Sequence, residues 1–65
     1  MPIITASGPA LDVDSKRKLA DGVTRVAAEV YRRPAEQIIV IIEEKPPENV
    51  AIGGTLVADR GQVGG

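Results

Sequence analysis

An unbroken aliphatic run, from Ile38 to Ile42, constrains the fold of this chain more than any other feature of its sequence. β-Branched side chains favour strands, and a strand without polar alternation is typical of one covered on both faces. The chain has only 65 residues, and the single long helix that it predicts can cover one of those faces. The run therefore predicts a strand whose second face is covered by another copy of the protein.

The length of the chain leads to the same expectation. Residues 1–65 are predicted to form a single domain, and a chain of this size buries only about 60% of the surface that its unfolded form exposes. Small domains gain stability from disulfides, from a metal or from oligomerisation. The sequence has no Cys, no His and no acidic cluster with metal-ligand spacing, so we expect no metal and predict an obligate oligomer.

The charge balance excludes some function classes. Eight Lys and Arg residues against nine Asp and Glu residues give a net charge of −1, which argues against a dedicated nucleic-acid binder. No apolar stretch has the length of a membrane span, and the first residues lack the basic and apolar regions of a signal peptide. We therefore expect a cytoplasmic protein without a nucleic-acid or membrane partner.

The first half of the chain predicts a strand followed by a helix. Residues 2–6 read as a strand that ends in a turn at residues 7–9, and either Asp12 or Asp14 is suited to cap the helix that follows. Pro34 disfavours helical geometry at Arg33, so the helix should end there. One face of this helix is apolar, through Leu19, Ala20, Val23, Val26, Ala27, Val30 and Tyr31.

The second half predicts a strand and a hairpin. The strand covers residues 37–42, residues 45–49 break the chain, and two apolar arms flank Gly53-Gly54, which suit a tight two-residue turn. Residues 60–65 are small and polar, and we expect a flexible tail. The fold class is α+β: a right-handed β-α-β unit with parallel strands, plus a C-terminal β-hairpin.

Few residues offer chemistry. Without His or Cys the common pairs of nucleophile and base are excluded. The neighbouring carboxylates Glu43 and Glu44 should point to opposite faces of a strand and end in solvent. The basic turn at residues 16–18 suits either an anion site at the helix start or, for at least two of its three residues, a solvated surface.

Pro2 is the exception among these residues. Met followed by a small residue is a usual substrate for removal of the initiator Met, and Pro2 would then carry a free secondary amine. An α-amino group titrates closer to neutral pH than most side chains, and apolar neighbours disfavour its charged form and lower its pKa. A base that works near pH 7 needs such a pKa. The alternative is that Pro2 simply opens a strand.

These residues together resemble the 4-oxalocrotonate tautomerase family. The resemblance covers about the first sixty residues, and rests on Pro2-Ile3, the long helix, the aliphatic strand and the segment Glu48-Asn49-Val50-Ala51-Ile52-Gly53-Gly54. It implies a tautomerase fold that assembles as a homohexamer, a trimer of dimers. It also implies a cofactor-independent isomerase, whose amino-terminal proline moves a proton between the oxygen and carbon of an enol.

The resemblance also indicates the pocket and its main departure from the family. Ile39, Val50 and Ile52 would line an apolar pocket around Pro2. Ile39 stands where the family has one substrate-binding arginine, the stretch at residues 10–12 lacks the other, and Val50 replaces an aromatic residue. Cations from a neighbouring subunit that would replace the arginines are Lys16, Arg17, Lys45 or Arg60.

Two hypotheses follow. The first is an enol-keto tautomerase that acts on enols of 2-oxo acids, with Pro2 as general base after removal of Met1. The second is a non-catalytic assembly module of the same fold, in which Pro2 only opens a strand; the missing arginines motivate it. Both predict a homo-oligomer, and the sequence selects neither the physiological substrate nor the replacing cation.

Overall fold

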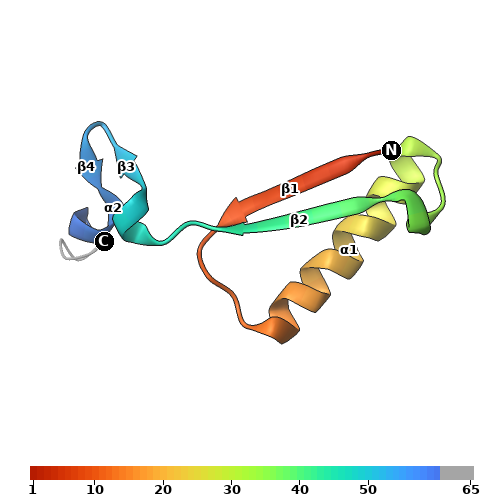
Figure 1. Cartoon of the computed structure of the whole chain (residues 1–65), viewed down its shortest axis with the longest axis horizontal. Helices are drawn as coiled ribbons and strands as arrows, with labels where there is room; N and C mark the ends of the chain where they lie inside the picture. Colours follow the sequence, from red (N-terminus) through yellow and green to blue (C-terminus); the bar gives the residue numbers. More distant parts are fainter. Residues whose placement is uncertain (61–65) are drawn as a thin grey trace.

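The structure, a computed structural model, describes residues 1–60 of the chain (Figure 1). Its elements follow one another in this order: β1 (Ile3–Gly8), α1 (Val13–Tyr31), a 3₁₀ turn (Ala35–Gln37), β2 (Ile39–Glu44), a second 3₁₀ turn (Pro47–Asn49), β3 (Ala51–Ile52), β4 (Thr55–Leu56) and α2 (Val57–Arg60). Arg60, expected to begin the flexible tail, instead ends the short helix α2. The rest of the predicted tail, residues 61–65, lies outside the described residues.

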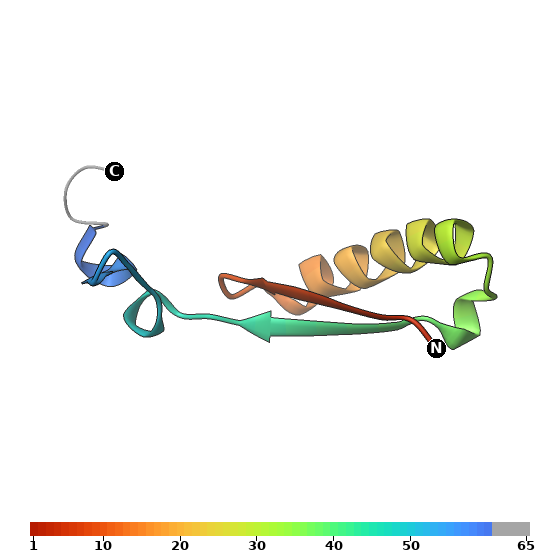
Figure 2. The same cartoon turned by 90° about the horizontal axis from the view of Figure 1, so that it is seen from above.

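Strands β1 and β2 form a parallel pair that α1 connects. Their register runs from Ile3 opposite Ile39 to Gly8 opposite Glu44. Figure 2 shows α1 along one side of the pair, as expected for a β-α-β crossover. The α+β fold class, with parallel strands and a later hairpin, is therefore confirmed.

Both strands begin and end later in the chain than predicted, at Ile3–Gly8 instead of residues 2–6 and at Ile39–Glu44 instead of residues 37–42. β1 continues through Ser7 and Gly8, which were expected in a turn, because both residues pair with the end of β2. The Gly8 carbonyl also accepts a hydrogen bond from the Lys45 N–H, with 2.7 Å between nitrogen and oxygen. β2 begins at Ile39 because Gln37 belongs to the preceding 3₁₀ turn, and it continues through Glu44.

Helix α1 is capped at both ends by its own sequence. Of the two expected caps, Asp12 is the one used: its carboxylate accepts a hydrogen bond from the Ser15 N–H at 3.1 Å. Its hydrogen bonds with Ser15 also lower the pKa of Asp12. The helix ends at Tyr31, two residues before the expected end, because Arg32 adopts a left-handed conformation with φ of 57°.

One face of the β1–β2 pair is covered by α1, and the other is exposed. Ile4 lies beside α1, whereas Ile3 and Ile41 on the opposite face remain 54% and 43% exposed. Among residues 1–60, Ala27 of α1 is the one apolar residue that is buried, with 7% exposure. A single copy therefore covers one face of the aliphatic strand and leaves the other open, as its sequence indicates.

The hairpin lies apart from the β-α-β unit. Gly53 and Gly54 form its turn with φ of 61° and 89°, which confirms the expected two-residue turn. Its arms are shorter than expected, since Val57 already belongs to α2. Beyond β2 the chain runs away from α1, so that β3, β4 and α2 occupy one end of a molecule measuring 45 × 25 × 16 Å (Figure 1).

Candidate active site

Pro2 lies immediately before β1 and is half-buried. Its carbonyl oxygen accepts a hydrogen bond from the Ile39 N–H, with 3.0 Å between the two atoms. This bond fixes the position of Pro2 through its carbonyl group. The proline nitrogen has no N–H in the Met1–Pro2 peptide and donates nothing to the sheet. Met1 itself is 84% exposed in the single chain.

Ile39 is brought to the same end of the sheet as Pro2. It begins β2, is half-buried and pairs with Ile3, the first residue of β1. In a parallel pair, opposed residues share a face, so Ile3 and Ile39 form one apolar patch next to Pro2. The structure thus places one of the three expected pocket residues, Ile39, together with Pro2.

Val50 and Ile52 lie at the other end of the molecule, in or beside the hairpin. Val50 is half-buried, and its carbonyl accepts a hydrogen bond from the Val57 N–H at 2.7 Å. Ile52 in β3 is 58% exposed. Figures 1 and 2 both show the hairpin and the N-terminus at opposite ends. One copy of the chain therefore does not bring Pro2 and Ile39 together with Val50 and Ile52.

Val50 contributes to a cavity of about 400 Å³ at the carboxyl end of the β1–β2 pair. The cavity is lined by Ser7, Gly8, Pro9, Lys45, Pro47, Val50 and Val57. Pro9, Pro47 and Val57 were not recognised as site candidates in the sequence, since the two prolines were interpreted only as chain breakers. The signal for Pro9 and Pro47 is their position shortly after the paired ends of β1 and β2, whereas Val57 follows β4 and had no such signal.

The candidate cations have different partners. The Nζ of Lys16 lies 2.6 Å from Oε2 of Glu44, and the Arg17 guanidinium lies 2.7 Å from the Asp14 carboxylate. The Nζ of Lys45 lies 3.5 Å from Oε1 of Glu43. The basic turn at residues 16–18 is thus largely engaged in ion pairs, which favours the solvated-surface interpretation over an anion site.

The two neighbouring carboxylates also differ from each other. Both end β2 and are exposed, as expected, and Glu44 also accepts a hydrogen bond from Lys16 and a second one, at 3.4 Å, from the Leu11 N–H. These two interactions, the one from Lys16 first, lower the pKa of Glu44. Glu44 therefore ties the start of α1 to the end of β2.

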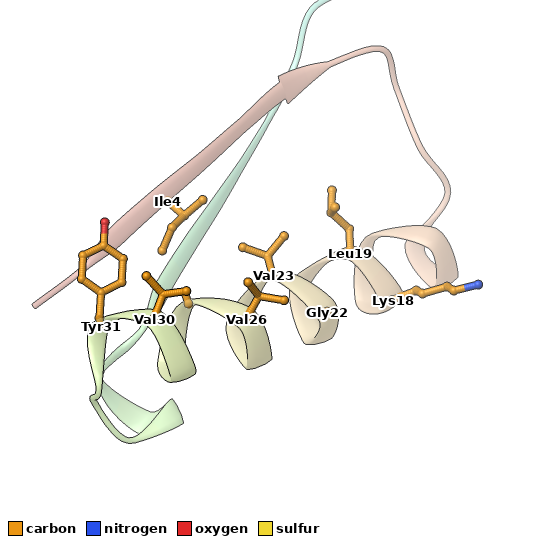
Figure 3. Close-up of a pocket in the computed structure, with 9 residues that line it drawn as sticks. Ile4, Lys18, Leu19, Gly22, Val23, Val26, Val30 and Tyr31 are labelled. Atoms are coloured by element: carbon orange, nitrogen blue, oxygen red, sulfur yellow. The ribbon is translucent and has the colours of Figure 1, made fainter.

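A groove along α1 is lined by neither Pro2 nor any of the three expected pocket residues, Ile39, Val50 and Ile52. It has a volume of about 660 Å³ and runs along α1, between the helix and Ile4 (Figure 3). Val23, Val26 and Val30 project from the helix into it, whereas Lys18 extends away. Val26 and Val30 are 64% and 70% exposed. A wall with so little polar surface suits packing against apolar side chains better than chemistry.

Neither a metal site nor a membrane-spanning helix is found within residues 1–60. In this part of the chain no group of three or more His, Cys, Asp or Glu residues is placed to hold a metal ion. None of its helices combines the length and the apolar character needed to cross a bilayer.

Solved structures share this fold with high similarity. DmpI from Archaeoglobus fulgidus is 45% identical, with a TM-score of 0.82 over 89% of this chain and 100% of that one. TomN, a 4-oxalocrotonate tautomerase homologue in the tomaymycin biosynthetic pathway, is 32% identical, with a TM-score of 0.86 over 94% of this chain and 95% of that one.

Sequence comparisons agree with the structural ones. A probable tautomerase of Bacillus cereus is 36% identical over 47 residues, which cover 72% of this chain and 77% of that protein. The family model described as "Tautomerase enzyme" matches residues 2–60, a span that includes Pro2 and the Gly53-Gly54 turn. With its parallel β-α-β unit and its Gly-Gly hairpin, this chain belongs to the tautomerase family.

Proposed function

We propose that this protein is a cofactor-independent enol-keto tautomerase, an isomerase that acts on enols of 2-oxo acids. Its general base is the amine of Pro2, set free by removal of Met1. Family membership supports tautomerase activity in general. The observation that carries the finer proposal is the half-buried Pro2, held by its carbonyl to Ile39 while its nitrogen makes no bond in the sheet.

The apolar surroundings of Pro2 support its role as a base. Ile3 and Ile39 lie next to it at the start of the two strands. Aliphatic neighbours disfavour the protonated amine, which lowers its pKa toward the working pH. The fixed φ of proline also holds the nitrogen lone pair in one direction.

The reaction needs only one proton carrier. Pro2 takes the proton from the enol hydroxyl, the oxygen lone pair forms the C=O bond, and the C=C electrons form a new C–H bond with the proton that Pro2 returns. The substrate and product have the same composition, so no oxidant or co-substrate is required. Since proton transfer of this kind contributes about 10²- to 10⁴-fold to rates, Pro2 alone supplies a substantial part of the catalysis.

The pocket in this proposal is shared between copies. Val50 and Ile52 lie at the opposite end of the chain from Pro2, so they reach a Pro2 only in another subunit. The open sheet face with Ile3 and Ile41, and the apolar groove along α1, provide surfaces for that assembly. We propose a homo-oligomer, and the family resemblance favours a homohexamer.

The experiment follows the absorbance of 2-hydroxymuconate, a diacid, and of the monoacid enol of phenylpyruvate. Wild type and Pro2→Ala are compared, each with its N-terminus established by intact mass and its fold by circular dichroism. We expect kcat of wild type to exceed that of Pro2→Ala by about 10² or more.

A Pro2→Ala variant as active as wild type would exclude Pro2 as the base. The absence of turnover of both enols by wild type would contradict the proposed function and favour the assembly module. The position of Ile39, where the family has an arginine, is the observation that keeps this second function in consideration.

A further inference from the structure

The cavity beside Val50 contains one ionisable side chain, Lys45, among the described residues that line it. Lys45 follows β2 directly, and its N–H donates to the Gly8 carbonyl at 2.7 Å, which holds its backbone against the end of β1. Its position at the cavity wall is therefore set by the sheet rather than by a loose loop.

The ammonium group of Lys45 is only weakly engaged. Its Nζ lies 3.5 Å from Oε1 of Glu43, longer than the 2.7–2.9 Å of a strong charge-assisted hydrogen bond. Both side chains are about half exposed, at 50% and 46%. An exposed pair of this length contributes little stability, so Lys45 can exchange Glu43 for another carboxylate at small cost.

The other candidate cations do not combine a position at the cavity wall with a weakly paired charge. Lys16 and Arg17 contact their carboxylates at 2.6 and 2.7 Å, and neither lines the cavity. Arg60, at the end of α2, does not line it either. Of the four cations that the sequence offers as replacements for the missing arginines, Lys45 is the one that lines the cavity to which Val50 contributes.

The rest of the cavity wall is mainly apolar. Pro9, Pro47, Val50 and Val57 contribute hydrocarbon surface, and Ser7 contributes a hydroxyl. One ammonium group above such a wall matches a ligand with one carboxylate and one apolar substituent. A dicarboxylate would leave its second charge against hydrocarbon without a partner, which is unfavourable.

We infer that Lys45 binds the carboxylate of the substrate, and that the cavity beside Val50 selects monocarboxylate enols with an apolar substituent. The inference rests on the proposed function, because the reacting carbon must meet Pro2 of another subunit. Lys45 is a binding residue in this scheme and moves no proton.

The first test measures binding without turnover. The full-length oligomer is titrated calorimetrically with 3-phenylpropanoate and with its neutral analogue 3-phenylpropanamide. We expect wild type to prefer the carboxylate, Lys45→Met to weaken carboxylate binding about tenfold, and amide binding to stay unchanged. Lys45→Arg should retain most of the affinity. Arg25→Met removes an equal charge from the exposed side of α1 and serves as the matched control, with unchanged binding expected.

The second test uses the monoacid enol of phenylpyruvate. Lys45→Met should raise KM by a similar factor and leave kcat nearly unchanged, since a residue that binds substrate and transition state equally affects KM alone. Pro2→Ala should lower kcat instead, so failure of the two proposals can be told apart.

Three results would overturn the inference about Lys45. They are unchanged carboxylate affinity in Lys45→Met, an equal loss in Arg25→Met, or a wild type that binds neither probe. A different pair of results would separate the two proposals. If Lys45→Met loses carboxylate binding and Arg25→Met does not, the Lys45 site stands. If Pro2→Ala is nevertheless active, Pro2 is rejected as the base.

Discussion

The N–H of Ile39 and the carbonyl oxygen of Pro2 are joined by a hydrogen bond 3.0 Å long, which aligns the start of β2 with the residue before β1. The bond does not involve the proline nitrogen. Cleavage between Met1 and Pro2 thus leaves the sheet intact and changes only the chemistry of that nitrogen. An amide nitrogen is not basic, whereas the freed secondary amine is.

We therefore expect a chain with an N-terminal extension that blocks removal of Met1 to lose enol turnover while keeping its fold. The same extension after Gly65 is the control and should be active. Intact mass identifies the N-terminus of each preparation, and the absorbance assay reports turnover. Full activity with the extension on Met1 would show that a free Pro2 amine is not needed.

Val26 faces the apolar groove along α1 and is 64% exposed in the single chain. If a second copy covers this groove, Val26→Glu places an unpaired carboxylate in an apolar interface, at a cost of several kcal/mol. We expect this variant to dissociate at micromolar concentration, as measured by sedimentation velocity. Arg25→Glu puts the same charge one position away on the exposed side, and it should stay assembled. A Val26→Glu variant as large as wild type would locate the interface elsewhere.

Gly53 has a φ of 61°, and a Cβ added there would meet no atom within 4 Å. The cost of Gly53→Ala is therefore conformational rather than steric, about 1–2 kcal/mol for a left-handed residue. We expect faster amide exchange at Val57, whose N–H donates to Val50, by a factor of about 5–30. Gly53→Asn should exchange more slowly than Gly53→Ala, since Asn tolerates this conformation. Equal exchange in the two variants would count against the conformational explanation.

The hydrogen bond from Lys16, followed by the one from the Leu11 N–H, lowers the pKa of Glu44 below its ordinary value of 4.5. A carboxyl with a lowered folded-state pKa stabilises the fold above its unfolded-state pKa, and this contribution is lost as pH falls through the folded-state pKa. Glu44→Gln should thus be less stable than wild type at pH 7, and the difference should shrink below about pH 4.5.

Urea unfolding of both proteins from pH 7 to pH 3 measures this difference. Glu36→Gln removes an exposed carboxyl from the first 3₁₀ turn and is the matched control. A gap between wild type and Glu44→Gln that stays constant with pH would mean that the ionisation of Glu44 contributes nothing to stability.

Local signals in the sequence predicted the elements well where one residue type decides the backbone. Gly53-Gly54 specified the turn because only positive φ closes it, and Asp12 capped α1 because its carboxylate reaches the Ser15 N–H. The ends of β1 and β2 were misplaced because pairing between residues distant in sequence extends both strands. Ser7 is polar and precedes Gly8, so only its pairing with Glu43 reveals it as a strand residue.

In the candidate site, too, some features follow from local sequence and others depend on the tertiary structure. Pro2 was proposed as the base from chemistry, since few other groups in this chain can act as a base near neutral pH, and this role stays a prediction. The separation of Ile39 from Val50 is a property of the tertiary arrangement, in which β2 carries the chain away from the N-terminus. The proximity of Lys45, Pro9 and Val50 likewise depends on where the two strands end.

The placement of Pro2 and the Val50 cavity at opposite ends of one chain bears on how such a gene can diverge after duplication. Each copy would contribute the base to one site and the binding wall to another, so a defect at one end spoils one site and spares the next. Two inactive chains, one damaged at each end, would complement each other when they assemble together. Substitutions at the hairpin end of one chain would then change the ligand specificity of a mixed assembly, while the other chain still supplies the Pro2 base.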